Sequence, residues 1–230
     1  MTNKRFLLLF CEKDSRALFV KKARKHFFFE KKKQKTFTLG VLGLLMGGAS
    51  AHAQSAPIGT LDQALLAAMK NGNAAFPTRY QALAPAIDQA FNLQQILKTI
   101  VGLRWSAIPA DQQAKLLAVF RAYTVANYTA NFNSGSGDQI RILPETRSVG
   151  ADRVVETEIV PTSGDSTRID YVMRQFPAGW QAVDVLEEGT ISQVAVQRSD
   201  FRSLLADGAG KLIDKLQAKV DTLSGGTIKP

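Results

Sequence analysis

The hydrophobic pattern of this 230-residue chain changes at the Gly- and Ser-rich stretch NSGSG, residues 133–137. Before this stretch, from about residue 60, apolar residues recur at spacings of three and four, which is typical of amphipathic helices. After it, apolar and polar residues alternate, which is typical of strands with one buried face. A run of helices followed by a run of strands predicts an α+β fold.

Four helices are predicted before this stretch, at 60–72, 78–91, 93–103 and 109–132. Thr60-x-x-Gln63 fits a capping box at the start of the first helix. Pro85 lies inside the second helix, where it should cause a kink or mark the first turn of a separate segment. Asn92 is a favourable N-cap for the third helix. Two further helices are predicted near the C-terminus, at 190–206 and 211–223.

Four strands are predicted between these helical regions, at 140–143, 153–160, 168–176 and 180–188. Their connections are short, as at Pro177-Ala178-Gly179, so neighbouring strands should be antiparallel. Alternation gives the strands an apolar face that contains Val155, Thr157, Ile159, Ile169, Tyr171, Met173, Val183 and Val185. We therefore expect a curled, four-stranded antiparallel sheet with about six helices packed on this face.

The segment TFTLGVLGLLMGGASAHAQ, at 36–54, is uncharged and follows a cluster of lysines. Its dense apolar part is too short for a membrane span, which needs about 20 residues. Ala51-His52-Ala53 is an A-x-A cleavage site, so we predict a secretory signal peptide that is cut between Ala53 and Gln54. The basic region ahead of it is longer than in most signal peptides, so we expect translation to start further downstream.

We therefore divide the chain into an N-terminal extension plus signal peptide at 1–53 and a single domain at 54–230. The chain has 29 Lys and Arg and 20 Asp and Glu, which gives a formal net charge of +9. Of these, 12 basic and 3 acidic residues precede residue 54, so the domain keeps 17 of each and is neutral. A neutral domain has no broad electrostatic surface for a phosphate backbone, and we expect no nucleic-acid partner.

The same division removes several kinds of chemistry from the domain. Cys11 is the only cysteine, His26 and His52 are the only histidines, and all three precede Ala53. The domain therefore lacks the residues for Cys-His or Ser-His-Asp catalysis, for His or Cys metal sites and for disulfides. We expect no metal and no cofactor. Because no cysteine for a lipid anchor follows the cleavage site, we expect a protein that is free in the periplasm.

Carboxylates remain as candidates for catalysis. Asp170 and Asp184 lie on adjacent predicted strands and could approach one another. Each lies on the more polar face of its strand, where a carboxylate is usually solvated. The sequence also contains many large apolar residues, and it does not distinguish a filled core from a hollow one. Two alternatives stay open from the residues alone: an enzyme that uses Asp170 or Asp184 as general base, and a periplasmic adaptor with a solid core.

Four stretches resemble a known family: RYQALAPAIDQAFNL (79–93), LRWSAIPADQQAKLLAVFRAYTVANYTANF (103–132), WQAVDVLEEGTISQVAVQRSDFRSLL (180–205) and GKLIDKL (210–216). They are similar to the periplasmic lipid-binding proteins of the Mla and toluene-tolerance family, and equally to its hopanoid-associated members. The most specific part is D-V-x-x-E-G at 184–189, followed by R-x-x-F at 198–201.

This resemblance implies a nuclear-transport-factor-like sheet with a helical subdomain, holding lipid acyl chains between them. It also implies a carrier, not an enzyme, that shuttles lipid between an outer-membrane lipoprotein complex and an inner-membrane ABC transporter with a ring of substrate-binding domains. We therefore predict a monomeric carrier of phospholipid or hopanoid-type lipid, with the acyl chains buried in an apolar cavity and the headgroup exposed.

The cavity should lie where the third and fourth helices face the sheet, with Val194 near its mouth. The predicted lipid-binding residues are Leu97, Ile100, Val101, Phe120, Tyr123, Val155, Ile159, Tyr171, Met173, Val185 and Val194.

Overall fold

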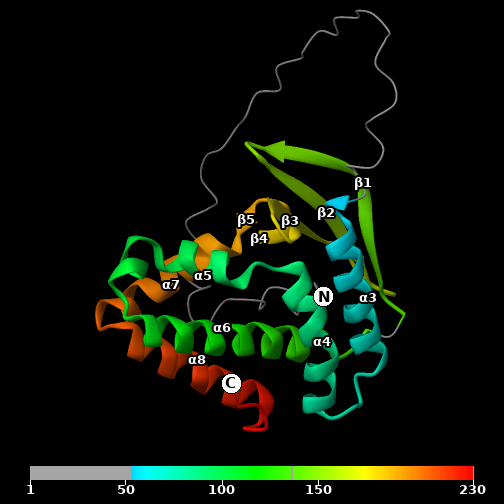
Figure 1. The fold of residues 1–230 in the computed structure, drawn as a ribbon. Coiled ribbons are helices and arrows are strands. Elements are labelled where there is room, and N and C mark those ends of the chain that lie inside the picture. Colours follow the sequence, from blue (N-terminus) through cyan, green and yellow to red (C-terminus); the bar gives the residue numbers. More distant parts are fainter. Residues whose placement is uncertain (1–52, 136, 230) are drawn as a thin grey trace, which may run out of the picture.

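The computed structural model describes residues 53–135 and 137–229 (Figure 1). The helices are α3 (Ala56–Lys70), α4 (Phe76–Ala90), α5 (Leu93–Val101), the 3-10 helix η2 (Gly102–Ala107), α6 (Ala110–Asn131), α7 (Gln193–Ala206) and α8 (Ala209–Ser224). The strands are β1 (Gln139–Val149), β2 (Asp152–Val160), β3 (Thr167–Phe176), β4 (Gly179–Glu187) and β5 (Ile191–Ser192). The α+β class and the six predicted helices are confirmed. The predicted signal peptide up to His52 lies outside the described residues.

The five strands form one open antiparallel sheet in the order β1-β2-β3-β4-β5, so the prediction of four strands was one too few. Tyr171 pairs with Val155 on one side and with Val185 on the other, and all three are buried. The predicted apolar face is therefore real across the three central strands. β5 was missed because two residues are too few to show alternation.

Two irregularities explain the other differences in the sheet. β1 continues well past its predicted end, because the register shifts between Ile142 and Thr146 and hides the alternation. A second shift lies in β4, where Met173 pairs with Ala182. Ala182 consequently takes the core position that the alternation predicted for Val183.

In Figure 1, α3 and α4 run upright beside the strands, and α6 and α8 lie side by side below the sheet. α3, α4, α5 and α7 contact strands, whereas α6 packs mainly against α8 and α4. The prediction that the fourth helix covers the sheet was therefore wrong for most of α6. Its residues from Ala122 to Thr129 are all buried, as expected of a helix that is enclosed on several sides. Tyr123 faces α8, with its ring centroid 5.6 Å from Lys219 Nζ.

The helix ends test the capping predictions. The Asn92 Oδ1 accepts a hydrogen bond from Gln95 N at 2.9 Å, which confirms Asn92 as the cap of α5. The capping box at Thr60 was wrong, because α3 begins four residues earlier and has a proline in its first turn. The Thr60 hydroxyl instead donates to Ala56 O within the helix. α4 runs through Pro85 as one helix.

Candidate functional site

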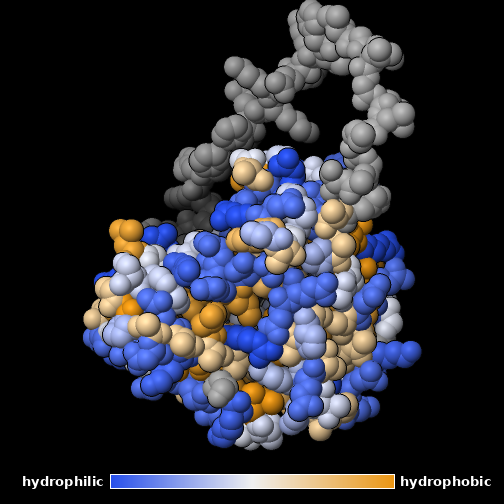
Figure 2. All heavy atoms as spheres, in the orientation of Figure 1, coloured by the Kyte–Doolittle hydropathy of each residue, from blue (hydrophilic) through white to orange (hydrophobic). Residues whose placement is uncertain are grey.

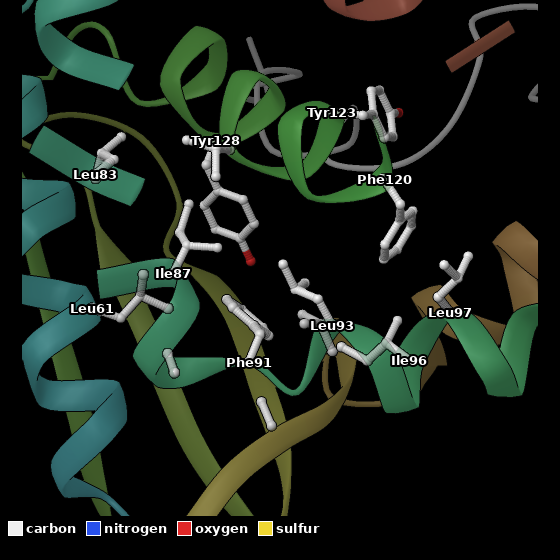
Figure 3. Close-up of a cluster of buried hydrophobic side chains, with 14 of the residues drawn as sticks. Leu61, Leu83, Ile87, Phe91, Leu93, Ile96, Leu97, Phe120, Tyr123 and Tyr128 are labelled. Carbon is white, nitrogen blue, oxygen red and sulfur yellow. The ribbon is translucent and has the colours of Figure 1, made fainter. Parts of the chain in front are cut away.

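The junction of α4 and α5 lies at the centre of the contact between helices and sheet (Figure 3). The ring of Phe91 is 5.7 Å from that of Tyr128 on α6 and 6.0 Å from that of Tyr171 on β3. Phe91 also forms a parallel bridge with Ala182, and the Asn92 N donates to Ala182 O at 3.0 Å. This short segment therefore fastens the helices to β4.

A narrow, mainly apolar cavity of about 20 Å³ lies beside Phe91, between α5, α6, α7 and β4. A volume of this order holds about one water molecule. Its walls are Phe91, Leu93, Ile96, Phe120, Thr124, Asp184, Val185, Gln193, Val194 and Gln197. In Figure 3, Leu93 and Ile96 on α5, Phe120 on α6 and Phe91 in the junction between α4 and α5 point toward this region.

A groove of about 250 Å³ opens to the surface next to this cavity. Both are lined by Phe91 and Leu93, so these two side chains separate the interior from solvent. Polar groups line the groove, including the exposed ion pair between Asp88 and Arg121, with its shortest N–O distance 2.6 Å. Figure 2 shows the surface hollowed between α5 and α6, with hydrophobic residues at the bottom of the hollow.

All eleven predicted lipid-binding residues belong to the buried hydrophobic core, but few of them line the cavity. Phe120, Val185 and Val194 do so. Ile100 and Val101 line a separate depression between α5 and α7. The remaining six, Leu97, Tyr123, Val155, Ile159, Tyr171 and Met173, are packed in the core. The cavity that Phe120, Val185 and Val194 line measures only about 20 Å³, so the described residues do not show the predicted apolar cavity for acyl chains.

Sequence reasoning missed much of the cavity wall. Phe91 and Leu93 flank the predicted helix cap Asn92. Large apolar residues on both sides of a cap could have indicated that this junction is buried. Thr124, Gln193 and Gln197 are polar, so apolar periodicity does not identify them as wall residues. The Gln197 side chain is only 1% exposed, and its Nε2 has no hydrogen-bond partner among the described residues. The wall therefore contains one unpaired buried donor.

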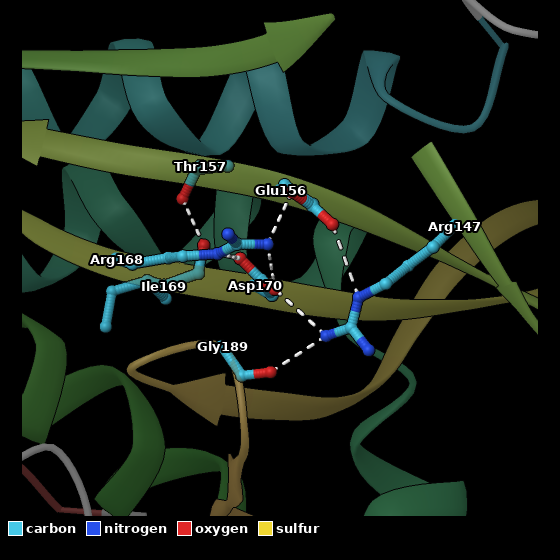
Figure 4. Close-up of polar contacts among 7 residues, drawn as sticks. All are labelled: Arg147, Glu156, Thr157, Arg168, Ile169, Asp170 and Gly189. Carbon is cyan, nitrogen blue, oxygen red and sulfur yellow. Dashed lines mark hydrogen bonds and ion pairs between the residues drawn. The ribbon is translucent and has the colours of Figure 1, made fainter. Parts of the chain in front are cut away.

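Asp170 belongs to a cluster of ions on the sheet face that points away from the helices (Figure 4). Its carboxylate is fully buried and pairs with Arg147 Nη2 at 3.1 Å and with Arg168 Nε at 2.9 Å. Both arginines also contact Glu156, the cross-strand neighbour of Asp170. Two cations thus hold the carboxylate. The expectation that it is solvated was wrong, because it is fully buried.

Asp184 belongs to β4, and its carboxylate lies next to the first turn of α7, whose N-cap residue is Ser192. The carboxylate accepts hydrogen bonds from the Ser192 hydroxyl at 2.5 Å, from Val185 N at 2.8 Å and from Val194 N at 3.1 Å. Burial raises the pKa of this carboxyl, and these donors act in the opposite direction. Asp170 pairs with Leu186 across the strands, so the two carboxylates are not directly opposite and have separate partners.

The D-V-x-x-E-G passage has a structural reason in this fold. Asp184 accepts a hydrogen bond from Val194 N in the first turn of α7, and Val185 enters the core. Glu188 and Gly189 then turn the chain with positive φ angles of 53° and 70°. Arg147 Nη2 donates to Gly189 O at 2.8 Å, which ties this turn to the ion cluster.

Residues 53–135 and 137–229 contain no group of three or more His, Cys, Asp or Glu side chains that could hold a metal ion. The same residues include no helix with the length and hydropathy to cross a bilayer. The fold and the site together define an α+β domain whose candidate site is a buried apolar junction between helices and sheet.

The sequence matches the family model of the MlaC protein over residues 60–218, and the chain therefore belongs to the MlaC family. This confirms the predicted Mla and toluene-tolerance family. A phospholipid-binding protein from Ralstonia solanacearum, solved in complex with a phospholipid, has a similar structure. The TM-score is 0.65 at 19% sequence identity, over 75% of this chain and 98% of the Ralstonia chain. No curated protein matches the sequence.

Proposed function

We propose that this protein binds a phospholipid in the junction between its helices and its sheet and carries it through the periplasm. The observation that carries the proposal is the similarity to the Ralstonia protein, which shares the fold over almost its whole length and holds a phospholipid. Membership of the MlaC family supports a binding and transport role over an enzymatic one.

The free energy of moving a lipid explains why such a carrier needs an apolar interior. Each CH₂ group exposed to water costs about 0.8 kcal/mol, so two acyl chains desorb slowly from a bilayer. A protein interior that encloses the chains removes most of this cost. The headgroup stays in water, so a neutral domain without histidine or cysteine suffices.

The cavity beside Phe91 must widen to admit an acyl chain. We propose that α5 moves to open it, because this helix has only nine residues and is followed by Gly102, whose φ is 66°. The groove beyond Phe91 and Leu93 gives the route to solvent, where the headgroup would lie. Gln197 Nε2 would donate a hydrogen bond to an ester carbonyl of the bound lipid.

The transport route is part of the same proposal. A signal peptide cut after Ala53 would deliver the domain to the periplasm as a free monomer. There it would exchange lipid with an outer-membrane lipoprotein complex and with an inner-membrane ABC transporter that carries substrate-binding domains. Hopanoid-type lipid is the second cargo that we propose to test.

Substitution in the cavity wall tests the proposal. Val194→Trp should fill the space beside Phe120 and lower the lipid that copurifies with the secreted protein by tenfold or more. The added ring is larger than the cavity of about 20 Å³, so the delipidated variant should also lose about 1–3 kcal/mol of stability by overpacking. Native mass spectrometry and lipid extraction measure the cargo, and the extract identifies phospholipid or hopanoid.

Ile142→Trp is the matched control, because Ile142 lies on β1 at 37% exposure and outside the cavity wall. It should leave the lipid content unchanged. Wild-type protein that never carries lipid would contradict the proposal, as would equal lipid loss in both variants.

A further inference from the structure

A depression of about 220 Å³ lies where α5 and η2 meet α7. α5 and α7 run side by side in Figure 1. Ile100, Val101 and Leu205 provide its apolar surface. Leu103 also lines it, and this residue is 96% exposed, so it projects almost entirely into solvent.

Three arginines line the same depression: Arg104 on η2, and Arg198 and Arg202 on α7. Arg198 reaches across to the start of η2, since its Nη2 lies 3.5 Å from the position that a Cβ on Gly102 would take. Among the described residues, none of the three forms an ion pair with a carboxylate. Asp200 is two positions from both Arg198 and Arg202, so it projects from another side of α7.

The clustering of these arginines lowers the stability of the protein when no partner is bound. Arg198 and Arg202 are four residues apart on one helix, and like charges at this spacing repel. The domain from residue 54 onward has equal numbers of basic and acidic residues, so this concentration of positive charge is local. Three guanidinium groups that have no carboxylate partner among the described residues surround an apolar surface. They therefore fit an anionic partner that also has an apolar interior.

We propose that the arginine surface, Arg104, Arg198 and Arg202 together with Leu103, docks the protein onto an anionic phospholipid bilayer. The guanidinium groups bind headgroup phosphates, which they match in geometry. Leu103 enters the boundary between headgroups and acyl chains. Trp105 on the same 3-10 helix is half-buried, with Lys98 Nζ 5.9 Å from its ring, and suits the bilayer interface.

A bilayer fits this surface better than an acidic protein does. A protein partner would need a pocket shaped for Leu103, whereas a bilayer accepts an apolar side chain at any position. α5 and α7 also form walls of the buried cavity, and Gln197, which lines it, precedes Arg198 in the chain. Docking would thus bring the proposed lipid site to the membrane surface. Docking is independent of the proposed carrier function, because the protein could bind the membrane surface without holding a lipid.

Vesicle flotation of the secreted protein tests the proposal. Wild type should bind vesicles that mix phosphatidylcholine with phosphatidylglycerol and should bind phosphatidylcholine vesicles much more weakly, with added salt lowering the binding. The double substitution Arg198→Gln with Arg202→Gln should lower partitioning about thirtyfold, at about 1 kcal/mol for each arginine. Leu103→Ser should also lower it, with all three arginines retained.

The control is Lys70→Gln with Arg141→Gln, which removes two exposed charges elsewhere and should lower binding far less. Lipid extraction from each variant keeps this test separate from that of the carrier function, since the arginine variants should retain their cargo. Equal binding of wild type to both kinds of vesicle overturns the proposal. So does equal binding of the double variant and wild type, or binding of wild type to polyglutamate but not to vesicles.

Discussion

Gly189 shows how a single residue can be required by its surroundings. Its φ is 70°, and a Cβ at this position would lie 2.9 Å from Arg168 Nε and 3.2 Å from Asp170 Oδ2. Any side chain would therefore press on the buried carboxylate and its arginine partner. The glycine of the family motif is explained by this contact and by its backbone conformation together.

Gly189→Ala should lower the free energy of unfolding by about 2–3 kcal/mol, because it combines backbone strain with displacement of an ion pair. Urea denaturation measures the change. Gly150→Ala is the matched control: its φ is 60°, but no atom lies within 4 Å of the added Cβ. It should cost only about 1 kcal/mol from the backbone alone. Equal losses in both variants would show that the contact with Asp170 is unimportant.

Asp62 is the buried acid for which the structure provides the least compensation. It is 5% exposed on α3, and its Oδ1 has no hydrogen-bond partner among the described residues. Burial raises the pKa of this carboxyl from 3.8 to about 7. The charge of Asp62 adds to the effect of burial in raising the pKa of Tyr128, which places the two groups near one another.

This raised pKa predicts a pH dependence of stability. The folded protein keeps a proton on Asp62 that the unfolded chain loses near pH 4, so stability falls as the pH rises from about 4 to about 7. The loss should be roughly 4 kcal/mol, and stability should level off above pH 7. Asp62→Asn should remove this slope in urea denaturation at a series of pH values. Asp111→Asn, at an exposed site on α6, should retain it.

At the scale of the elements, Arg79 joins the beginning of α4 to the end of α6. Its Nη1 donates to Thr129 O at 2.7 Å and its Nε donates to Ala74 O at 3.1 Å. Thr129 O is one of the last carbonyls of α6, which lack partners within their own helix. The guanidinium is also 5.7 Å from the ring centroid of Phe76. A buried cation thus completes one helix end and orients another.

Arg79→Met should lower the free energy of unfolding by about 2–3 kcal/mol, because it leaves a buried carbonyl without a donor. Arg121→Met is the comparison on the surface. It breaks the exposed pair with Asp88 and should cost less than about 1 kcal/mol. Thermal and urea denaturation of both variants give the difference. Equal effects would mean that Arg79 acts as an ordinary surface charge.

The sequence predicted the elements that have a long, regular pattern. The period-2 alternation placed β2 and β3 almost at their observed bounds, and Asn92 marked the start of α5. The strand predictions were wrong where a register shift interrupts the alternation or where a strand is too short to show it. The register shifts in β1 and β4 hide alternation, and β5 is stabilised by its pairing with β4 and not by its own residues.

At the scale of the molecule, the sequence predicted which residues are buried better than it predicted which of them surround a space. Burial follows from apolar periodicity, and all eleven predicted residues are in the core. The cavity wall depends on where α4 gives way to α5 and on polar side chains of α6 and α7, such as Thr124 and Gln197. These positions are set by packing between elements that are distant in the chain.

The domain organisation gives a prediction for the whole chain. Secreted protein should begin at Gln54, which intact-mass measurement checks, and a mass that retains residues 36–53 would contradict the predicted cut. The processed protein would contain no cysteine or histidine, so reductant and chelator should leave its melting temperature unchanged. Loss of several kcal/mol of stability on adding a chelator, as at structural metal sites, would contradict this prediction.

Both edges of the sheet are poorly suited to pairing with a strand of another molecule. β1, on one edge, shifts its register at a stretch that contains Pro144, which cannot donate a backbone hydrogen bond. On the other edge, the two residues of β5 and the bridge from Phe91 cover part of β4. Exposed, regular edges promote aggregation, and interruptions of this kind suppress it. The segment that fastens the helices to the sheet therefore also helps to keep crowded copies of the protein apart.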